Sequence, residues 1–572
     1  MRSPSLTVND TFLNSGAAPK DLLISCALMM GGNAAVSRAK LLSRISGGTA
    51  KPCHSTASQA RDRLHGSANV EDVMATDKSL RDALRSPTAF LSRNLDTVPD
   101  VNVLTRYEAW WEAEGRAISS AVDRAGTPWV RMFNTAGQRV DEILFPPDYW
   151  RMLKRGYGEG VIWRSFQEKS LLHSCALIYL VSFYDPGLAC PYTVSLSTAV
   201  PLSKYADEPV RSRFMPHLLA QDESVWQGAT WMTEIKGGSD LGTAVETVAR
   251  REGDHFLLTG DKYFASNVGA ELAVVAARIE GAPTGIRGVS LFLLPRLTRA
   301  GRLNYFIRRL KDKIATRSVP TGEVELRDSE AYLLGADQQG IYLILETLNI
   351  SRIANSMGAV ALAQRAISDA LAYAQTRVAF GKPVIEHPLL ARQFEERVAA
   401  LHSAFALAWE AARLLDDVWQ QRPPYSDGYH LFRLVAHLAK YWTAEFAAQT
   451  AKWCMEVHGG IGILNEFGAD RWLREAMILA IWEGTCHRQI LDGLEVMERK
   501  RAHELLFSHL SSKAPGTDFA PMRRRIEHLL ALPSEERQAN AEALFRDLAV
   551  LTGDTLARAH AQREYAQAGH RP

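Results

Sequence analysis

The sequence predicts a multidomain α+β fold with an α-helical N-terminal domain, an antiparallel β-sheet middle domain and a C-terminal four-helix bundle. Three observations lead to this prediction. The chain has 572 residues, and a single hydrophobic core stops growing at about 250 to 300 residues. Apolar residues follow a helical spacing in the first and last parts of the chain. Between them lie short β-rich runs separated by turn residues.

Composition and charge are those of a soluble globular protein and give no signal for a highly charged partner. Hydrophobic residues make up 47% of the sequence and charged residues 23%, close to the average for globular chains. Lys and Arg number 66 against 64 Asp and Glu, so the net charge is only +2. A whole-protein attraction to nucleic acid or to an anionic membrane is therefore not expected.

Cysteine spacing and the length of apolar runs indicate the redox compartment and whether a membrane span is expected. The six cysteines include no Cys-x-x-Cys pair, which argues against a zinc cluster and against a disulfide-stapled secreted domain. The apolar run that comes nearest to a membrane span, Leu22 to Val36, is too short and is interrupted by polar residues. We predict a cytoplasmic protein in a reducing compartment, with no metal site and no membrane span.

Residues 1–85 are expected to form a poorly structured extension. The first 70 residues contain no Glu and few Asp, but many Ser and basic residues. Organelle transit peptides and plain disordered extensions share this bias. Both interpretations stay open, and the first would make the protein mitochondrial.

Two domains are predicted to follow this extension. Residues 86–227 form the α-helical N-terminal domain, because apolar residues recur every three to four positions in segments such as 107–122 and 163–183. Residues 228–337 form the β middle domain. Its expected strands include 256–259, 273–276, 289–294 and 323–326, and Gly260-Asp261 is expected to form a tight hairpin turn.

Residues 338–500 are predicted to form the helical bundle. A stripe of apolar residues from Ile353 to Ala374 marks one long helix. Pro423-Pro424 separates a second helix, 389–419, from a third, 430–457, which ends at Gly459-Gly460. Residues 501–572 are expected to form a helical tail with nearly balanced charge.

The order of these domains bears on cofactor binding. Helices, then strands, then helices do not fit the doubly wound βαβ sheet of most nucleotide-binding enzymes. The chain also lacks Gly-x-Gly-x-x-Gly after a strand and Gly-x-x-x-x-Gly-Lys-Ser/Thr. A bound cofactor phosphate would need another cradle.

Four short motifs carry groups suited to chemistry. Segments 232–240 and 262–267 offer hydroxyls, glycines and an aromatic ring to a heterocycle or phosphate; a polar loop and a half-buried strand are the alternatives. Segment 377–383 offers a cation to a diphosphate or to a helix end. In 481–485, Glu483 stands among apolar residues, where desolvation would raise its pKa. A surface-turn glutamate is the alternative there.

In their order along the chain, these motifs resemble the acyl-CoA dehydrogenase family. They include Met-Thr-Glu from Met232, Arg-x-x-Phe-Gly-Lys-Pro from Arg377, Gly-Gly-Ile-Gly from Gly459 and Trp-Glu-Gly-Thr from Trp482. Within the family, Leu310-Lys-Asp-Lys-Ile and the residues around Gly459 are most similar to the AidB-type, alkylation-response branch. The resemblance covers roughly residues 86 to 500 and implies FAD bound where the β domain meets the bundle.

The resemblance also implies which residues bind FAD. The flavin ring and phosphates would meet Met232, Thr233, Gly238, Ser239, Phe264 and Ser266. Contacts across the subunit interface of a homodimer or homotetramer would come from Arg377 and Phe380. The adenosine and ADP parts would meet Glu456, Val457, His458, Gly459, Gly460, Thr485 and His487. Phe264 stands where the family usually has Trp, Glu456 where much of it has Gln, and His487 where Gln or Asn is commoner.

The implied reaction is α,β-dehydrogenation of an acyl-CoA thioester, in fatty acid or branched-chain acyl metabolism. Glu483 would remove the α-proton while the β-hydrogen leaves as hydride to flavin N5. Some relatives carry the base on the first bundle helix instead, but Ser351 occupies that position here. Arg352 would be a substrate-side cation or a solvated helix residue. Trp482, where many relatives have Tyr, would narrow the acyl pocket and leave it for a branched or short chain, or with poor turnover.

Two other interpretations stay open. An AidB-type flavoprotein would mainly bind or protect DNA and have weak dehydrogenase activity, for which a basic C-terminal face is expected. Only Arg523 to Arg525 and Lys500-Arg501 stand out in that region. An acyl-CoA oxidase or flavin monooxygenase on the same fold would differ in whether O2 reaches the reduced flavin. The sequence does not identify the electron acceptor.

Overall fold

The computed structural model describes residues 78–125, 128–337 and 339–567. All of them belong to one compact unit of the chain. The predicted extension, 1–85, therefore lies almost wholly outside the described residues. Its last part, Lys78–Arg85, is a helix, α5, whereas the sequence analysis places it in the unstructured segment. The helix forms because Leu80, Ala83 and Leu84 share one face and are buried.

The region after α5 is mainly helical, as predicted. Its helices are α6 (Pro87–Asn94), α7 (Val101–Trp110), the π-helical turn η2 (Trp111–Gly115), α8 (Arg116–Ala125), α9 (Tyr149–Gly158), α10 (Trp163–Glu168), α11 (Leu172–Tyr184), α12 (Ala189–Tyr205) and α13 (Glu208–Leu218). The sequence analysis did not predict the hairpin of β1 (Trp129–Phe133) and β2 (Arg139–Leu144) within it. Its signal is the turn at Asn134 to Gly137, where Gly137 has a φ of 75°.

The middle region is a seven-stranded sheet. Its strands are β3 (Thr230–Trp231), β4 (Val248–Glu252), β5 (His255–Ser266), β6 (Leu272–Ile279), β7 (Val289–Pro295), β8 (Phe306–Leu310) and β9 (Thr321–Leu334). They pair in the order β3-β6-β4-β5-β9-β7, β8 pairs with β9, and β6 also pairs with β7, which closes the sheet on itself. All four predicted strands are present. Most pairings are antiparallel, but β3 and β4 pair with β6 in parallel.

The prediction of a hairpin turn at Gly260-Asp261 is wrong. Strand β5 continues through both residues, with an irregular register against β9 between Leu258 and Gly260. The chain turns instead at Gly253, where Glu252 pairs with His255. Gly260 serves close packing, because a Cβ atom there would lie 2.6–2.9 Å from atoms of Thr247, the residue directly before the neighbouring strand β4.

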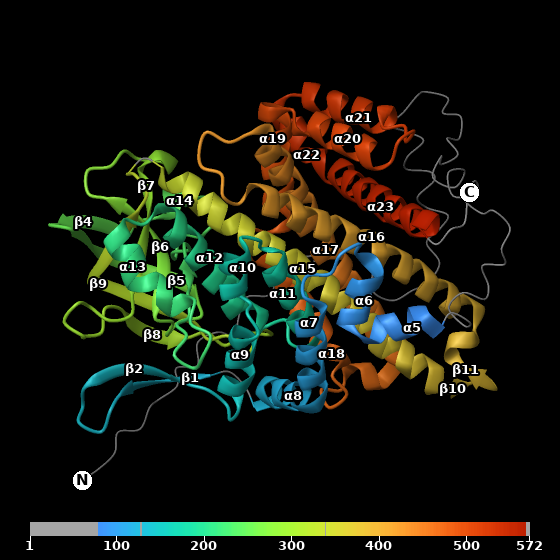
Figure 1. Ribbon diagram of the computed structural model, residues 1–572, viewed down its shortest axis with the longest axis horizontal. Coiled ribbons are helices and arrows are strands. Elements are labelled where there is room, and N and C mark those ends of the chain that lie inside the picture. Colours follow the sequence, from blue (N-terminus) through green and yellow to red (C-terminus); the bar gives the residue numbers. More distant parts are fainter. Residues whose placement is uncertain (1–77, 126–127, 338, 568–572) are drawn as a thin grey trace, which may run out of the picture. The chain divides into compact units, whose positions relative to one another are not determined.

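The C-terminal region is a helical bundle whose long helices match the predicted segments. They are α15 (Gly340–Thr376), α16 (Pro388–Val418) and α17 (Asp427–His458), followed by the short helix η5 (Gly459–Ile463), α18 (Ala469–Ile481) and α19 (Cys486–Lys500). Four more helices complete the described chain, namely α20 (Ala502–Lys513), α21 (Ala520–Ala531), α22 (Ser534–Ala539) and α23 (Ala541–Gln567). Figure 1 shows α15 running from the sheet into the bundle.

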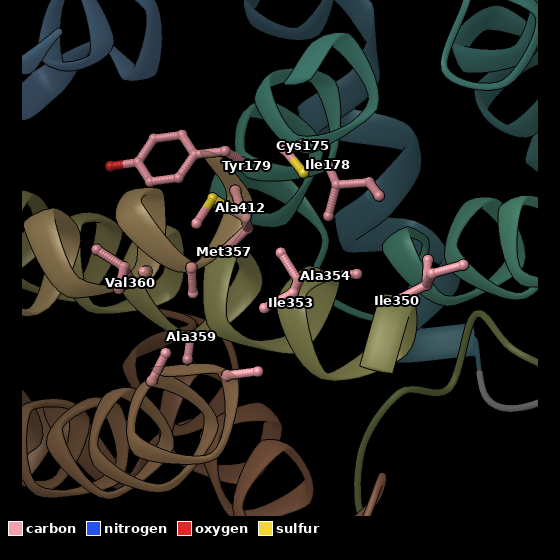
Figure 2. Packing of buried hydrophobic residues seen from close by; sticks show 14 of the residues in the cluster. Cys175, Ile178, Tyr179, Ile350, Ile353, Ala354, Met357, Ala359, Val360 and Ala412 are labelled. Atoms are coloured by element: carbon pink, nitrogen blue, oxygen red, sulfur yellow. The ribbon is translucent and has the colours of Figure 1, made fainter. Parts of the chain in front are cut away.

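Helix α15 is the centre of the main hydrophobic core. It is buried on nearly all sides because other elements surround it, and its buried residues include polar ones among the apolar majority. Figure 2 shows Cys175, Ile178 and Tyr179 of α11 on one side of it and Ala359 on the opposite side. Met357 and the residues around it are fully buried in this cluster. The residues of α15 that bear polar side chains are therefore held in fixed positions.

One described helix, α16, is long and apolar enough on average to cross a membrane. Most of its apolar window is buried inside the fold, and α15, α17 and α23 contact it. These contacts are those of a bundle core helix.

The packing around α15 gives a first prediction. Met357→Ala should lower the free energy of unfolding by about 2 to 5 kcal/mol, because it leaves a cavity where the side chain is fully buried. Denaturant unfolding measures this effect. Met477→Ala is the matched control, since Met477 is an exposed residue of α18, and it should change stability by no more than about 0.5 kcal/mol. Equal effects of the two substitutions would contradict the assignment of α15 to the core.

Candidate active site

The loop between α18 and α19 carries Glu483 in an unusual backbone conformation. Glu483 has a φ of 59° and the next residue, Gly484, a φ of 96°. Glycine adopts such angles freely, but a glutamate in the left-handed region is uncommon and costs free energy. Thr485 then caps α19, as its hydroxyl accepts a hydrogen bond from the Arg488 amide. The loop is thus a tight turn whose middle residue is held in place by its surroundings.

Buried side chains from two helices hold the main chain of this loop. Lys440 of α17 donates hydrogen bonds to the carbonyls of Ala480, at 3.2 Å, and Gly484, at 2.7 Å. Gln489 of α19 donates to the carbonyls of Glu483 and Gly484 at 3.0 and 3.1 Å. His437 contacts the amide oxygen of Gln489 at 2.9 Å, so the amide nitrogen is left to face the loop.

Arg352 of α15 is part of the same support. Its side chain is buried and donates to the Glu483 carbonyl at 3.4 Å, to the Asn349 amide oxygen at 2.9 Å, and to Asp492 at 3.4 Å. The sequence analysis offered a substrate-side cation or a solvated residue. In the structure Arg352 faces the main chain behind Glu483, and solvent does not surround it.

A narrow pocket opens beside Glu483. Its lining comes from α11 and the turn after it, α12, α15, α18 and the loop, and most of the lining side chains are small or apolar. The lining residues are Ser182, Pro186, Ala189, Cys190, Thr193, Val194, Ser351, Ala354, Asn355, Gly358, Leu479, Trp482 and Glu483. Trp482 is fixed in the wall by a hydrogen bond from its indole N–H to the Asn355 amide oxygen. The pocket suits a slender, mainly apolar group.

The electrostatics of Glu483 follow from this position. Burial raises the pKa of its carboxyl to about 7, while the charges of Arg352 and Lys440 and a hydrogen bond with Ser351 oppose the rise. Lys440 is affected in turn, since burial lowers its pKa to about 8. Near neutral pH, Glu483 is therefore balanced between its two protonation states. Such a carboxylate beside an apolar pocket is a competent proton acceptor.

The segment from Lys313 to Thr321 joins this pocket to the sheet. Lys313 donates hydrogen bonds to the Thr316 and Val319 carbonyls and to the Thr321 hydroxyl. The Thr321 hydroxyl lies 3.4 Å from the hydroxyl of Ser266, at the end of β5. Val319 packs against Cys190 and Val194 of the pocket wall. The Leu310–Ile314 motif was noted in the sequence analysis, but its role as this connection was missed because it depends on contacts distant in sequence.

The predicted flavin residues lie on the loop before β4 and at the end of β5. A buried ion pair between Lys262 and Glu234, at 2.5 Å, fixes the base of this loop. A Cβ atom at Gly238 would lie 2.3 Å from the Thr233 hydroxyl, so glycine permits the close fold of the loop. Met232 is buried, Thr233, Gly238 and Ser266 are half-buried, and Ser239 and Phe264 are exposed. The exposed groups and the glycine form a surface that a flat heterocycle and a phosphate can approach.

Most of the remaining predicted cofactor residues lie near the junction of α15 and α16. Arg377 precedes a small hairpin of β10 (Val378–Ala379) and β11 (Lys382–Pro383), and Phe380 lies in its turn with a side chain 97% exposed. The His458 ring stacks on Tyr373, one turn before Arg377, at 4.8 Å. The hairpin and the end of α17 therefore lie side by side.

Other members of this set are placed as follows. Glu456 forms an ion pair with Lys452, Val457 is half-buried, Gly459 and Gly460 are exposed, and His487 is exposed beside Thr485. Within the described chain the predicted FAD residues thus lie in three places: at the sheet, at the hairpin with the end of α17, and, for Thr485 and His487, at the start of α19 beside Glu483.

The basic residues of the tail are partly neutralised. Arg523 forms an ion pair with Glu504 at 3.1 Å, and Arg525 forms one with Asp547 at 2.7 Å. Two of the three consecutive arginines thus already have carboxylate partners. DNA binding by this tail stays a prediction.

Three family models match successive parts of the chain. They are the Adaptive response protein AidB N-terminal domain over residues 67–223, the acyl-CoA dehydrogenase middle domain over 229–329 and the acyl-CoA dehydrogenase C-terminal domain over 338–497. Among curated relatives, acyl-CoA dehydrogenase family member 11 of Caenorhabditis elegans is 30% identical over 69% of this chain and 67% of its own. The putative acyl-CoA dehydrogenase AidB of Escherichia coli is 28% identical over 76% and 83%.

Solved structures agree with these matches. A protein named Bd2924, in its apo form, has a TM-score of 0.74 and 28% identity, over 86% of this chain and 97% of its own. The Caenorhabditis elegans ACDH-11 complex with C11-CoA has a TM-score of 0.72 over 89% and 91%, with 24% identity. The chain therefore belongs to the acyl-CoA dehydrogenase family, in its AidB-type branch.

Proposed function

We propose that this protein is an FAD-dependent acyl-CoA dehydrogenase that introduces an α,β double bond into an acyl thioester, with Glu483 as the base. The observation that carries the proposal is a carboxyl of pKa about 7, held in a strained loop beside a narrow, mainly apolar pocket. Membership in the family supports a dehydrogenase-type function. The proposal assigns the pocket to the acyl chain.

In the proposed reaction the acyl chain enters the pocket with its α-carbon at Glu483. The carboxylate removes the α-proton and becomes a neutral acid, while the β-hydrogen leaves with its electron pair and the Cα–Cβ double bond forms. When bound, FAD supplies the two-electron acceptor for that hydride. Lys440, Gln489 and Arg352 keep the carboxylate in place through its main chain. The pocket walls exclude water from the reacting carbons.

The proposed FAD site spans two subunits of a homodimer or homotetramer. Phe380 has a φ of 52° and projects from its hairpin with almost its whole side chain exposed. Ile463 and Leu464, just after the neighbouring end of α17, are exposed as well. Exposed apolar side chains on a rigid turn are typical of protein interfaces. Arg377 at the same hairpin would offer a bidentate cation to a diphosphate.

Glu483→Gln tests the base directly. The substitution keeps the shape of the side chain and removes its ability to accept a proton, so turnover should fall by a factor of about 10² to 10⁴. Anaerobic bleaching of the flavin absorbance by acyl-CoA esters measures the reaction.

Glu475→Gln is the matched control. Glu475 is another buried glutamate of α18 whose pKa burial raises to about 7, but it does not line the pocket. Its substitution should leave bleaching within a few-fold of the wild type. Undiminished bleaching in Glu483→Gln would show that another group is the base.

The pKa of Glu483 sets the pH dependence. A base must be ionised, so kcat/KM should rise with pH through about 7 and level off above it. Lys440→Met removes a positive charge that lowers this pKa, so the rise should move to higher pH and the maximum rate should fall. Lys500→Met, at an exposed position on α19, should leave the profile in place. A profile flat between pH 6 and 9, or one that Lys440→Met does not move, would contradict the assignment.

Arg377→Ala tests the cofactor site across subunits. The wild type should elute as a dimer or tetramer with one FAD per chain, and the variant should lose FAD on dilution, as judged by the ratio of flavin to protein absorbance. Arg392→Ala, an exposed arginine of α16 paired with Glu396, should retain FAD. A monomeric wild type that keeps its full FAD would rule out the shared site.

A further inference from the structure

The pocket beside Glu483 contains two buried polar atoms without a hydrogen-bond partner. They are the amide nitrogen of Asn355, a residue 6% exposed, and the hydroxyl of Ser182, which is fully buried. Both residues line the pocket. Other buried polar atoms of the described chain also lack a partner, but these two belong to residues that line one small pocket. Since buried polar groups are usually paired, their shared location calls for an explanation.

The orientation of Asn355 is fixed by chemistry. The indole N–H of Trp482 is only a donor, and it points at the Asn355 amide oxygen. The amide of Asn355 therefore cannot be turned round without facing two donors to each other. Its NH2 group is left buried and without a hydrogen-bond partner, on a residue that lines the pocket.

Ser182 stands on α11, opposite α15. Gly358 of α15 lies close to it, since an added Cβ atom there would lie 3.2 Å from the Ser182 hydroxyl. Because position 358 has no side chain, α15 offers this buried hydroxyl no polar partner there. A hydroxyl can both donate and accept, so it complements the amide donor of Asn355.

The other hydroxyls of the pocket differ from Ser182. Thr193 donates to the carbonyl of Ala189 at 2.9 Å, as helix threonines commonly do. Ser351 lies 3.2 Å from the hydroxyl of Ser197. The two groups without a partner, on Asn355 and Ser182, are therefore confined to one part of the lining.

That part lies away from the reacting carbons. Ser351 contacts the Glu483 carboxyl, and Asn355 and Gly358 follow it on the same face of α15. With a rise of 1.5 Å per residue, Asn355 lies about 6 Å and Gly358 about 10 Å beyond Ser351 along the helix. An acyl chain with its α-carbon at Glu483 would bring atoms several bonds past the β-carbon to this level.

We propose that the substrate is an acyl-CoA whose chain carries an oxygen function, keto or hydroxyl, several bonds beyond the reacting carbons. The oxygen would accept a hydrogen bond from the Asn355 amide and exchange one with the Ser182 hydroxyl. Ala189, Val194, Ala354 and Leu479 of the same lining suit the hydrocarbon part of the chain. This inference rests on the proposed function, since it assigns the pocket to an acyl chain.

A plain alkyl chain would cover both polar atoms and leave them unpaired. Sites built to hydrogen-bond a substrate group discriminate strongly against the analogue that lacks it, because their own polar groups are then buried unpaired. The predicted preference is thus for the oxygenated chain over its alkyl counterpart of equal length.

The test compares CoA esters of equal chain length that are unsubstituted, hydroxylated or ketonic, with the oxygen moved stepwise from the δ-carbon to the end. Binding is measured by calorimetry to the FAD-loaded Glu483→Gln variant, which does not depend on turnover, and kcat/KM is measured on the wild type. At the best position the oxygenated ester should bind at least about tenfold more tightly than the alkyl ester. Comparing the hydroxylated with the ketonic esters shows which of the two oxygen functions the pocket prefers.

Substitutions in the pocket should change that ratio. Ser182→Ala and Asn355→Leu should each bring the ratio of the two Kd values to within about threefold of one, since each removes one of the unpaired groups. Ser203→Ala is the matched control: this α12 serine donates to the Val200 carbonyl and does not line the pocket, so its ratio should stay at the wild-type value. If the Asn355→Leu variant fails to fold, the Ser182→Ala variant still tests the proposal.

The outcomes separate the two proposals. Equal or tighter binding of the alkyl ester, or a preference that survives both substitutions, overturns the inference of an oxygenated substrate, while flavin bleaching by alkyl esters would still support the dehydrogenase. If a fully flavin-loaded enzyme binds esters but none of either kind bleaches it, the proposed function itself is wrong.

Discussion

The rest of the site depends on one buried cation. Lys440 lies on α17, and its ammonium group donates to two carbonyls of the loop that turns from α18 into α19. Without Lys440, the Ala480 carbonyl near the end of α18 would lose its ammonium donor, and the Gly484 carbonyl would keep only its hydrogen bond from Gln489. Carbonyls at the end of a helix need such partners. The loop could then relax away from the conformation that holds Glu483 at a φ of 59°. The strained backbone that positions the carboxylate depends on this contact, together with the hydrogen bonds that Gln489 and Arg352 donate to the same loop.

The same cation sets a limit on the chemistry. Desolvation alone would push the pKa of Glu483 upward until it stayed protonated at neutral pH, and a neutral acid cannot act as a base. Lys440 and Arg352 oppose that effect, and both are paired mainly with main-chain atoms or with other residues rather than with the carboxylate itself. A direct ion pair would lower the pKa too far and make the carboxylate a weak base. Cations held close to the carboxylate but bonded elsewhere keep the pKa near 7.

Much of this arrangement could be predicted from the sequence, and the limits have physical causes. The long helices and four of the strands could be predicted from the spacing of apolar residues, because each element buries an apolar face or is buried on all sides. Glu483 could be singled out because a carboxylate among apolar residues is unusual. The hairpin at Gly260 could not be excluded, since a glycine needed for close approach to Thr247 looks the same in sequence as one needed for a turn.

Arg352, Lys440 and Asn355 illustrate a second limit. Each is a polar residue in the interior of a long helix, and sequence alone leaves open whether such a residue faces water or a buried partner. The role of each comes from a loop or helix more than forty residues away. Polar side chains acquire their function from contacts that the local pattern does not contain.

The pocket shows why those distant contacts matter for specificity as well as for catalysis. Trp482 narrows the pocket by its bulk, and it also orients Asn355, since its indole N–H takes up the amide oxygen. A residue that the sequence suggests only as a steric wall thereby determines which group of the amide is left for a ligand. Because Glu483 follows Trp482 directly, the loop held by Lys440 places the base and the polar wall of the pocket together. In the proposed reaction, proton removal at one end of the acyl chain and recognition further along it would therefore depend on the same few residues.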